Sequence, residues 1–162
     1  MSRLMGIDID SIQKNRLESA LNYAKHINGI VVLKGAGTIV ASPDGRARIS
    51  EFASPVLAKA GTGDVLAGVI AGLVAQNVDS FEAASLGVYL HADMGRRVAE
   101  NYGNAAGIAQ DLLKVMPASR KMLDGIEASA IDTFGTNTLL PNTIQSHQPG
   151  EQFMEELAHN LD

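Results

Sequence analysis

The segment Lys59-Ala60-Gly61-Thr62-Gly63-Asp64 places glycines, a hydroxyl group and a carboxylate directly before an apolar stretch, residues 65–76. Glycine allows the backbone to bend so that successive N–H groups point at one spot, and a helix directly after it adds the positive end of its dipole. The segment therefore predicts an anion-binding loop made by Gly61, Thr62 and Gly63.

Asp64 would stand at the edge of that loop. A carboxylate repels a bound anion unless it has a chemical task, such as taking the proton from a hydroxyl that attacks a phosphoryl group. Asp64 is therefore our first candidate for a catalytic base. A helix N-cap is the alternative, and the two roles are compatible. For the neighbouring Lys59, position alone does not decide between a phosphate contact and an ordinary exposed lysine.

Composition limits what this loop can belong to. The chain has 162 residues, 46% of them hydrophobic, which predicts one globular domain. A net charge of −5 with no basic run argues against nucleic acid or an anionic membrane as a partner. There are no cysteines, as suits a reducing compartment, and residues 1–6 lack the apolar core of a signal peptide. We expect a cytoplasmic protein.

The first half of the chain reads as helix, strand and hairpin. Asp10 and Gln13 form a capping pair, and apolar residues then recur at helical spacing up to Gly29. Residues 30–34 are a β-branched run typical of a strand buried on both faces in a parallel sheet. The Pro-Asp-Gly turn at residues 43–45 predicts a hairpin.

The second half reads as helices. Asp79 and Glu82 form a capping pair before a long helix that reaches about Tyr102, and a third helix over residues 106–116 should end at Pro117. Gly68 and Gly72 share one face of the helix over residues 65–76, where we expect a neighbouring element to pack closely.

Two further expectations concern the long helix and the C-terminal region. His91 lies on the long helix without the spacing or third ligand of a metal site, so we expect a packed or hydrogen-bonded histidine. Residues 125–162 are polar and predict a flexible extension with a short terminal helix, which leaves residues 1–124 as the folded portion.

Several motifs, taken in order, resemble a known family. They are Val31-Val32-Leu33-Lys34-Gly35-Ala36-Gly37-Thr38, Pro43-Asp44-Gly45, Ala60-Gly61-Thr62-Gly63-Asp64 with the apolar helix after it, and Leu86-Gly87-Val88-Tyr89-Leu90-His91. In this order they are similar to the motifs of the ADP-dependent NAD(P)H-hydrate dehydratases of the ribokinase-like superfamily. The match extends from Leu4 to about Leu123.

The resemblance implies a fold and a reaction. The fold would be α/β, the C-terminal portion of a ribokinase-like three-layer domain with a partial parallel sheet, a β-hairpin and helices packed on it. The reaction would remove water from 6-hydroxylated, damaged NADH or NADPH. ADP or ATP with Mg²⁺ would phosphorylate the hydroxyl, and elimination of phosphate would come next.

The resemblance also implies roles for residues. Lys34, Gly35, Ala36, Gly37 and Thr38 would line the AMP part of the nucleotide. Gly63, together with Gly61 and Thr62, would lie near the phosphates, and Asp64 would contact the hydrated nicotinamide. The residues by themselves leave plainer readings open, since Lys34 could be a solvated lysine and Thr38 could serve only a turn.

The chain also departs from the family pattern. Full members carry an upstream part with several strands and a Thr-Pro-His…Gly-Glu motif, and residues 1–6 resemble the segment that comes directly after that motif. Ala53-Ser54-Pro55-Val56 replaces a common Gly-Asn-Pro-Gly. An apolar strand edge should then be exposed, which predicts a homo-oligomer or a separate N-terminal half as partner. Alternative functions are a small-molecule kinase of the same fold and a non-catalytic nucleotide-binding fragment.

Overall fold

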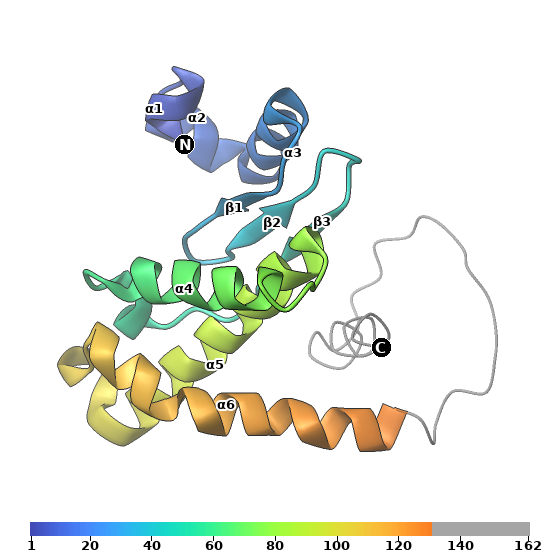
Figure 1. The fold of residues 1–162 in the computed structure, drawn as a ribbon. Coiled ribbons are helices and arrows are strands. Elements are labelled where there is room, and N and C mark those ends of the chain that lie inside the picture. Colours follow the sequence, from blue (N-terminus) through green and yellow to red (C-terminus); the bar gives the residue numbers. More distant parts are fainter. Residues whose placement is uncertain (131–162) are drawn as a thin grey trace.

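A small antiparallel sheet lies between helices in the computed structural model, which describes the backbone of residues 1–130 and the side chains of residues 1–123 (Figure 1). The sheet has the order β1-β2-β3, with β1 Val31–Leu33, β2 Ile39–Ala41 and β3 Ala47–Ile49. Helix α3 (Arg16–Ile27) covers one face, and helices α4 (Thr62–Val74) and α5 (Ser80–Ala106) lie on the other. The arrangement is a three-layer α/β fold, as predicted.

Strand β1 packs on both faces because its side chains alternate between two clusters, although Val32 is only partly buried. Val31 and Leu33 pack with Ala20 and Ala24 of α3, whereas Val32 packs with the cluster that contains Leu66 and Phe81. The predicted parallel pairing is wrong for the described strands, since β1 pairs with β2 and β2 with β3 in antiparallel fashion. The short loop between β1 and β2 explains this, because a parallel connection needs a crossover of a dozen or more residues.

The N-terminal region forms three helices rather than one. They are α1 Ser2–Met5, α2 Ile9–Lys14 and α3 Arg16–Ile27. The capping residue of α2 is Asp8, not Asp10, because its carboxylate accepts a hydrogen bond from the N–H of Ser11 at 2.9 Å. Asn28, in the left-handed conformation, is the C-cap of α3, one residue before the predicted Gly29.

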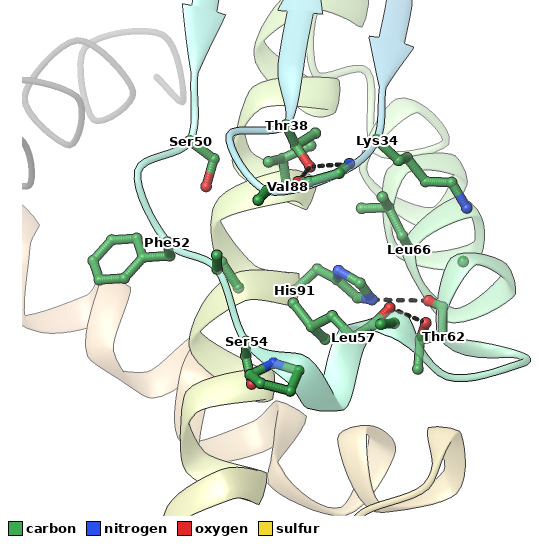
Figure 2. A pocket seen from close by; sticks show the side chains of 17 residues that line it. Lys34, Thr38, Ser50, Phe52, Ser54, Leu57, Thr62, Leu66, Val88 and His91 are labelled. Carbon is green, nitrogen blue, oxygen red and sulfur yellow. Dashed lines mark hydrogen bonds between the residues drawn. The ribbon is translucent and has the colours of Figure 1, made fainter. Parts of the chain in front are cut away.

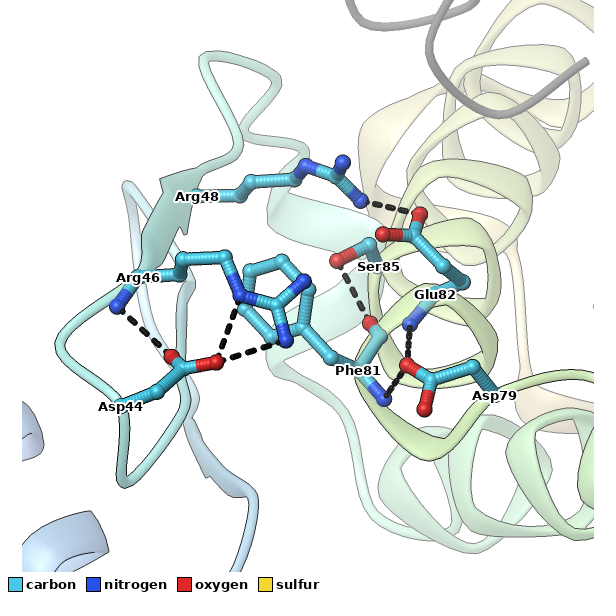
Figure 3. A network of polar contacts seen from close by, with 7 residues as sticks. All are labelled: Asp44, Arg46, Arg48, Asp79, Phe81, Glu82 and Ser85. Atoms are coloured by element: carbon cyan, nitrogen blue, oxygen red, sulfur yellow. Dashed lines mark hydrogen bonds and ion pairs between the residues drawn. The ribbon is translucent and has the colours of Figure 1, made fainter. Parts of the chain in front are cut away.

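The predicted hairpin is confirmed, and an ion pair fastens it to α5. Gly45 takes a positive φ of 95° in the turn between β2 and β3. Arg48 of β3 forms an ion pair with Glu82 of α5, and the guanidinium groups of Arg46 and Arg48 lie over the ring of Phe81 at 4.5 and 4.8 Å (Figure 3). The hairpin is therefore held to the helical layer by charge as well as by apolar contact.

Four further elements complete the described fold. They are the short 3-10 helix η1 Pro55–Ala58, α4 Thr62–Val74, α5 Ser80–Ala106 and α6 Ala109–Ala130. Asp79 caps α5 as predicted, accepting from the N–H groups of Phe81 and Glu82. In α5 the backbone leaves the helical conformation at Gly103. Within residues 1–130 no helix is both long enough and apolar enough to cross a bilayer.

The sequence predicted that the third helix ends at Pro117, but α6 continues through the proline to Ala130. Proline removes one helical hydrogen bond. Before the proline, Leu112, Val115 and Met116 pack with Met94 and Val98 of α5. Beyond it, Leu123 packs against the cluster that contains Leu86 and Leu90 of α5, so contacts with α5 hold the helix on both sides of the proline. The predicted extension over 125–162 is therefore helical up to Ala130, and its remainder lies outside the described residues.

The close approaches in the helical layer occur at other glycines than predicted. A β-carbon on Gly87 would lie 2.5 Å from Cγ1 of Ile70, and one on Gly95 would lie 2.7 Å from Cγ of Leu57. Gly68 and Gly72 have no described atom within 4 Å of that position. Glycine is thus needed on α5, where it meets α4 and η1, whereas the glycine face of α4 is open.

Candidate functional site

Polar groups gather around a cavity of about 520 Å³, which we call the Lys34 cavity (Figure 2). Four parts of the chain form its wall: the loop after β1, residues 50–58, the first turn of α4 and the middle of α5. Its lining residues include Lys34, Gly35, Ala36, Thr38, Ser54, Leu57, Thr62, Gly63, Leu66, Val88 and His91.

The loop over residues 34–38 is held in a fixed shape. Gly35 and Gly37 adopt φ values of 147° and 66°, in the region that favours glycine. The hydroxyl of Thr38 donates to the carbonyl of Gly35 at 2.9 Å and accepts from its N–H at 3.3 Å. Thr38 therefore closes the turn at the cavity wall.

Arg16 supports this loop from behind. Its Nη2 donates to the carbonyls of Leu33 and Gly37, each at 3.1 Å, and its Nη1 donates to the side chain of Gln13 at 3.2 Å. One guanidinium thus joins the two ends of the loop to the start of α3. Sequence reasoning missed this role, because the contacts cross 17 and 21 residues and follow no local pattern.

The first turn of α4 forms the opposite wall. Gly61 precedes the helix with φ 82°, and no side chain caps the helix end. The hydroxyl of Thr62 lies 2.7 Å from the carbonyl of Leu57 and 2.8 Å from that of Lys59, which ties α4 to η1. Among the described residues the N–H of Gly63 has no hydrogen-bond acceptor. An uncapped helix N-terminus with a free N–H is a binding place for an anion.

Lys34 reaches across the cavity to this helix end. A β-carbon built on Gly63 would lie 2.3 Å from Nζ of Lys34. The ammonium group, the N–H of Gly63 and the dipole of α4 therefore place positive charge at one spot. The two segments expected to bind the nucleotide, far apart in the sequence, meet here.

His91 lies between the walls on α5. Its Nε2 is 2.8 Å from the carbonyl of Thr62, as expected for a hydrogen-bonded helix histidine. Burial lowers the pKa of His91 below its usual value of 6.5, and the charge of Lys34 lowers it further, against the effect of the Thr62 hydrogen bond. The imidazole is therefore neutral at neutral pH.

Asp64 lies on a different cavity from Gly63, its neighbour in sequence. This second cavity, the Asp64 cavity, has a volume of about 490 Å³ and lies among α4, α5 and α6, with Gly68, Gly72, Leu113 and Met116 in its wall. Asp64 is exposed and sits in the first turn of α4, but Gly61, not Asp64, is the N-cap residue. The N-cap alternative for Asp64 is therefore wrong.

Lys59 does not face the Lys34 cavity. Its ammonium group donates to the carbonyls of Ala105 and Gly107, at 2.6 and 2.5 Å. Lys59 thus fastens the end of α5 to the segment before α4. Of the two readings that the sequence left open for this lysine, neither the phosphate contact nor the freely exposed side chain describes it.

Comparison with known proteins identifies the family. The family profile described as NAD(P)H-hydrate dehydratase matches residues 1–118. The chain belongs to the NAD(P)H-hydrate dehydratase family. A bifunctional NAD(P)H-hydrate repair enzyme of Moorella thermoacetica is 44% identical over 117 residues, which are 72% of this chain and 22% of that protein. An ADP-dependent (S)-NAD(P)H-hydrate dehydratase of Neisseria meningitidis is 38% identical over 128 residues, 79% of this chain and 43% of that protein.

A solved structure of this dehydratase family has the same fold. The ADP/ATP-dependent NAD(P)H-hydrate dehydratase of Bacillus subtilis, co-crystallised with ATP and Mg²⁺, superposes with a TM-score of 0.72 at 31% identity. The superposition covers 75% of this chain and 44% of that one. The ribokinase-like fold class expected from the sequence is thereby confirmed, and the chain spans less than half the length of the relatives it matches.

The site residues expected from the family resemblance divide between the two cavities. Lys34, Gly35, Ala36, Thr38, Thr62 and Gly63 line the Lys34 cavity. Gly37 and Gly61 do not line it but set the backbone conformation of its two loops. Of the expected site residues, Asp64 lines the second cavity.

Proposed function

We propose that this chain takes part in the ADP-dependent dehydration of hydrated NADH or NADPH. ADP would occupy the Lys34 cavity with its phosphates at Lys34 and the N–H of Gly63. Asp64 would take the proton from the substrate hydroxyl as its oxygen attacks the β-phosphorus of ADP. AMP would leave, and the phosphorylated hydrate would then lose phosphate together with a proton from the neighbouring ring carbon, which restores the reduced nicotinamide.

One observation carries this proposal: Nζ of Lys34 lies against Gly63 at the uncapped start of α4. Two glycine-containing loops from separate parts of the chain thereby direct a cation and a free N–H to the same point, as phosphate binding requires. The cavity beside them, about 520 Å³, is within the size range of sites that hold a cofactor-sized ligand.

The position of Asp64 supports its role as base. Gly63 and Asp64 are neighbours on the first turn of α4 but line different cavities. Nucleotide and acceptor hydroxyl would therefore approach the helix end from different sides, which suits transfer of a phosphoryl group between them. The carboxylate is exposed, so a substrate hydroxyl can reach it.

The described residues do not fit a metal site made by the protein alone. Within them no three His, Cys, Asp or Glu side chains gather where they could hold a metal ion. We therefore propose Mg²⁺ as an ion that arrives with the nucleotide, and no step above depends on it.

We also propose a cytoplasmic protein that works with a second copy or a separate N-terminal half. Among the described strands β1 pairs only with β2, so its other edge has no strand partner there. The matched relatives are more than twice as long as the matched segment. A strand from such a partner would complete the sheet.

An assay with hydrated NADH, ADP and Mg²⁺ tests the function. The expected result is release of AMP and phosphate in equal amounts, with return of the near-ultraviolet absorbance of reduced nicotinamide. A phosphorylated product that persists would favour the kinase alternative. ADP binding without turnover, at high protein concentration, would favour the non-catalytic alternative.

A further inference from the structure

His91 carries a ring nitrogen for which the described fold supplies no partner. The residue is only 8% exposed, yet it lines the Lys34 cavity. Its Nε2 is engaged by Thr62, whereas no hydrogen bond reaches Nδ1 from any residue that the structure describes. Figure 2 shows the ring with this second nitrogen directed into the cavity, toward the side of Thr38 and Val88.

The partner of Nε2 decides what Nδ1 can do. A backbone carbonyl only accepts, so Nε2 must carry the hydrogen and donate it to the Thr62 oxygen at 2.8 Å. A neutral imidazole has one N–H, and Nδ1 is then a bare acceptor. Burial and the nearby Lys34 charge, which lower the pKa of His91, keep the ring in this neutral form.

The bond to Thr62 leaves Nδ1 available to a ligand. Among the buried polar side-chain atoms of residues 1–123, only Oγ of Ser119 lacks a hydrogen-bond partner, so Nδ1 is open to the space of the cavity. The cavity wall around the ring includes the apolar side chains of Leu57, Leu66 and Val88, which offer no donor. A ligand in the cavity can supply one.

We propose that His91 is a ligand-contact residue whose Nδ1 accepts a hydrogen bond from an N–H or O–H group of the nucleotide in the Lys34 cavity. The inference rests on the proposed function. Phosphate oxygens are mostly deprotonated at neutral pH and accept hydrogen bonds, so they would bind at Lys34 and Gly63. Nδ1 is directed toward the side of Thr38 and Val88 and needs a donor, so it would bind the nucleoside part. A nucleoside diphosphate carries such donors in its exocyclic amino group and its sugar hydroxyls.

Two substitutions at His91 separate the nitrogens. In His91→Gln the longer amide can still donate to the Thr62 carbonyl but has no acceptor at the Nδ1 position. In His91→Asn the shorter amide places its oxygen near the Nδ1 position and loses the bond to Thr62. The matched control is His26→Gln, since His26 is exposed on α3 and is absent from the cavity wall.

The experiment measures ADP binding by calorimetry and stability by thermal unfolding. We expect His91→Gln to unfold near the wild-type temperature and to bind ADP about tenfold more weakly, the effect of one hydrogen bond of about 1.4 kcal/mol. His91→Asn should be less stable than His91→Gln but retain more affinity per folded molecule. His26→Gln should bind like the wild type.

Nucleotide analogues then identify the donor. IDP replaces the amino group by a carbonyl, and 2′-deoxy-ADP and 3′-deoxy-ADP each lack one hydroxyl. The analogue that lacks the relevant donor should bind wild type about tenfold more weakly than ADP, and this difference should disappear in His91→Gln.

Two results would overturn the inference. The first is that His91→Gln binds ADP as tightly as the wild type, or that an analogue loses the same affinity in both proteins. Either outcome would show that His91 does not contact the nucleotide, and the proposed function would still stand. The second is that the wild-type chain does not bind ADP at all, which would contradict the proposed function as well as the role of His91. The two kinds of failure are therefore distinguishable.

Discussion

Nζ of Lys34 occupies the space that a side chain on Gly63 would need, because a β-carbon there would lie 2.3 Å away. The lysine comes directly after β1, and the glycine is in the first turn of α4. Their contact joins the sheet layer to the helical layer at a point where a cation, a free N–H and a helix dipole meet. Binding of a phosphate should therefore depend on the absence of a side chain at position 63.

Gly63→Ala should weaken ADP binding without unfolding the chain. The new methyl group would push the flexible end of Lys34 aside rather than strain the backbone, so thermal stability should change little. Loss of a charge-assisted contact to phosphate should raise the Kd for ADP about tenfold or more. Calorimetric titration measures this effect.

Gly68→Ala is the matched control for Gly63→Ala. It makes the same substitution further along α4, where no described atom lies within 4 Å of the new carbon. Helix propensity predicts a gain of up to about 1 kcal/mol in the free energy of unfolding, with unchanged ADP affinity. Equal loss of affinity in both variants would contradict the role of the Lys34–Gly63 contact.

Asp64→Asn should abolish turnover and leave ADP binding nearly unchanged. The amide keeps the size of the carboxylate but cannot take a proton. Asp64 lines the second cavity, so the substitution leaves the wall of the Lys34 cavity intact. The measurement is steady-state release of phosphate, in parallel with ADP titration, in an assembly that is active with wild type. Undiminished turnover would exclude Asp64 as the base.

Features of the fold that depend on neighbouring residues were predictable from the sequence, whereas those that depend on tertiary packing were not. The turn at Pro43-Asp44-Gly45 and the cap at Asp79 depend on neighbouring residues, and both were correctly predicted. The helix past Pro117 and the close contacts of Gly87 and Gly95 depend on tertiary packing, which local patterns do not record.

The site shows the same division between local and long-range information. Glycine spacing and family resemblance indicated both loops of the Lys34 cavity, but neither could show that Asp64 lines a second one. Arg16 and the Nδ1 atom of His91 left no signal in the local pattern. Their roles depend on groups that the fold brings together. Arg16 donates to the carbonyls of Leu33 and Gly37, and His91 is bonded to the carbonyl of Thr62.

Stability should fall on mild acidification because of His91. Burial lowers its pKa in the folded protein below 6.5, so as the pH drops below about 6.5 the unfolded chain binds a proton that the folded chain does not. The free energy of unfolding should therefore decline until the pH reaches the folded pKa. Urea unfolding between about pH 7.5 and 5.5 measures this, and the decline should be smaller in His91→Gln. An identical decline in wild type and His91→Gln would assign it to other groups.

The ion pair between Arg48 and Glu82 should contribute to stability mainly by preventing an unpaired buried charge. The two side chains are 17% and 6% exposed, and they join β3 to the first turn of α5 (Figure 3). Arg48→Met keeps much of the side-chain length over the ring of Phe81 but leaves the Glu82 carboxylate without this partner, so we expect a loss of roughly 3 kcal/mol in the free energy of unfolding. Glu82→Gln should cost less, because a neutral amide is cheaper to bury than a charge.

In the double variant the combined loss should be smaller than the sum of the two single losses, since the uncompensated charge is gone. Chemical denaturation of the four proteins completes the cycle, and strictly additive losses would show that the pair is not coupled.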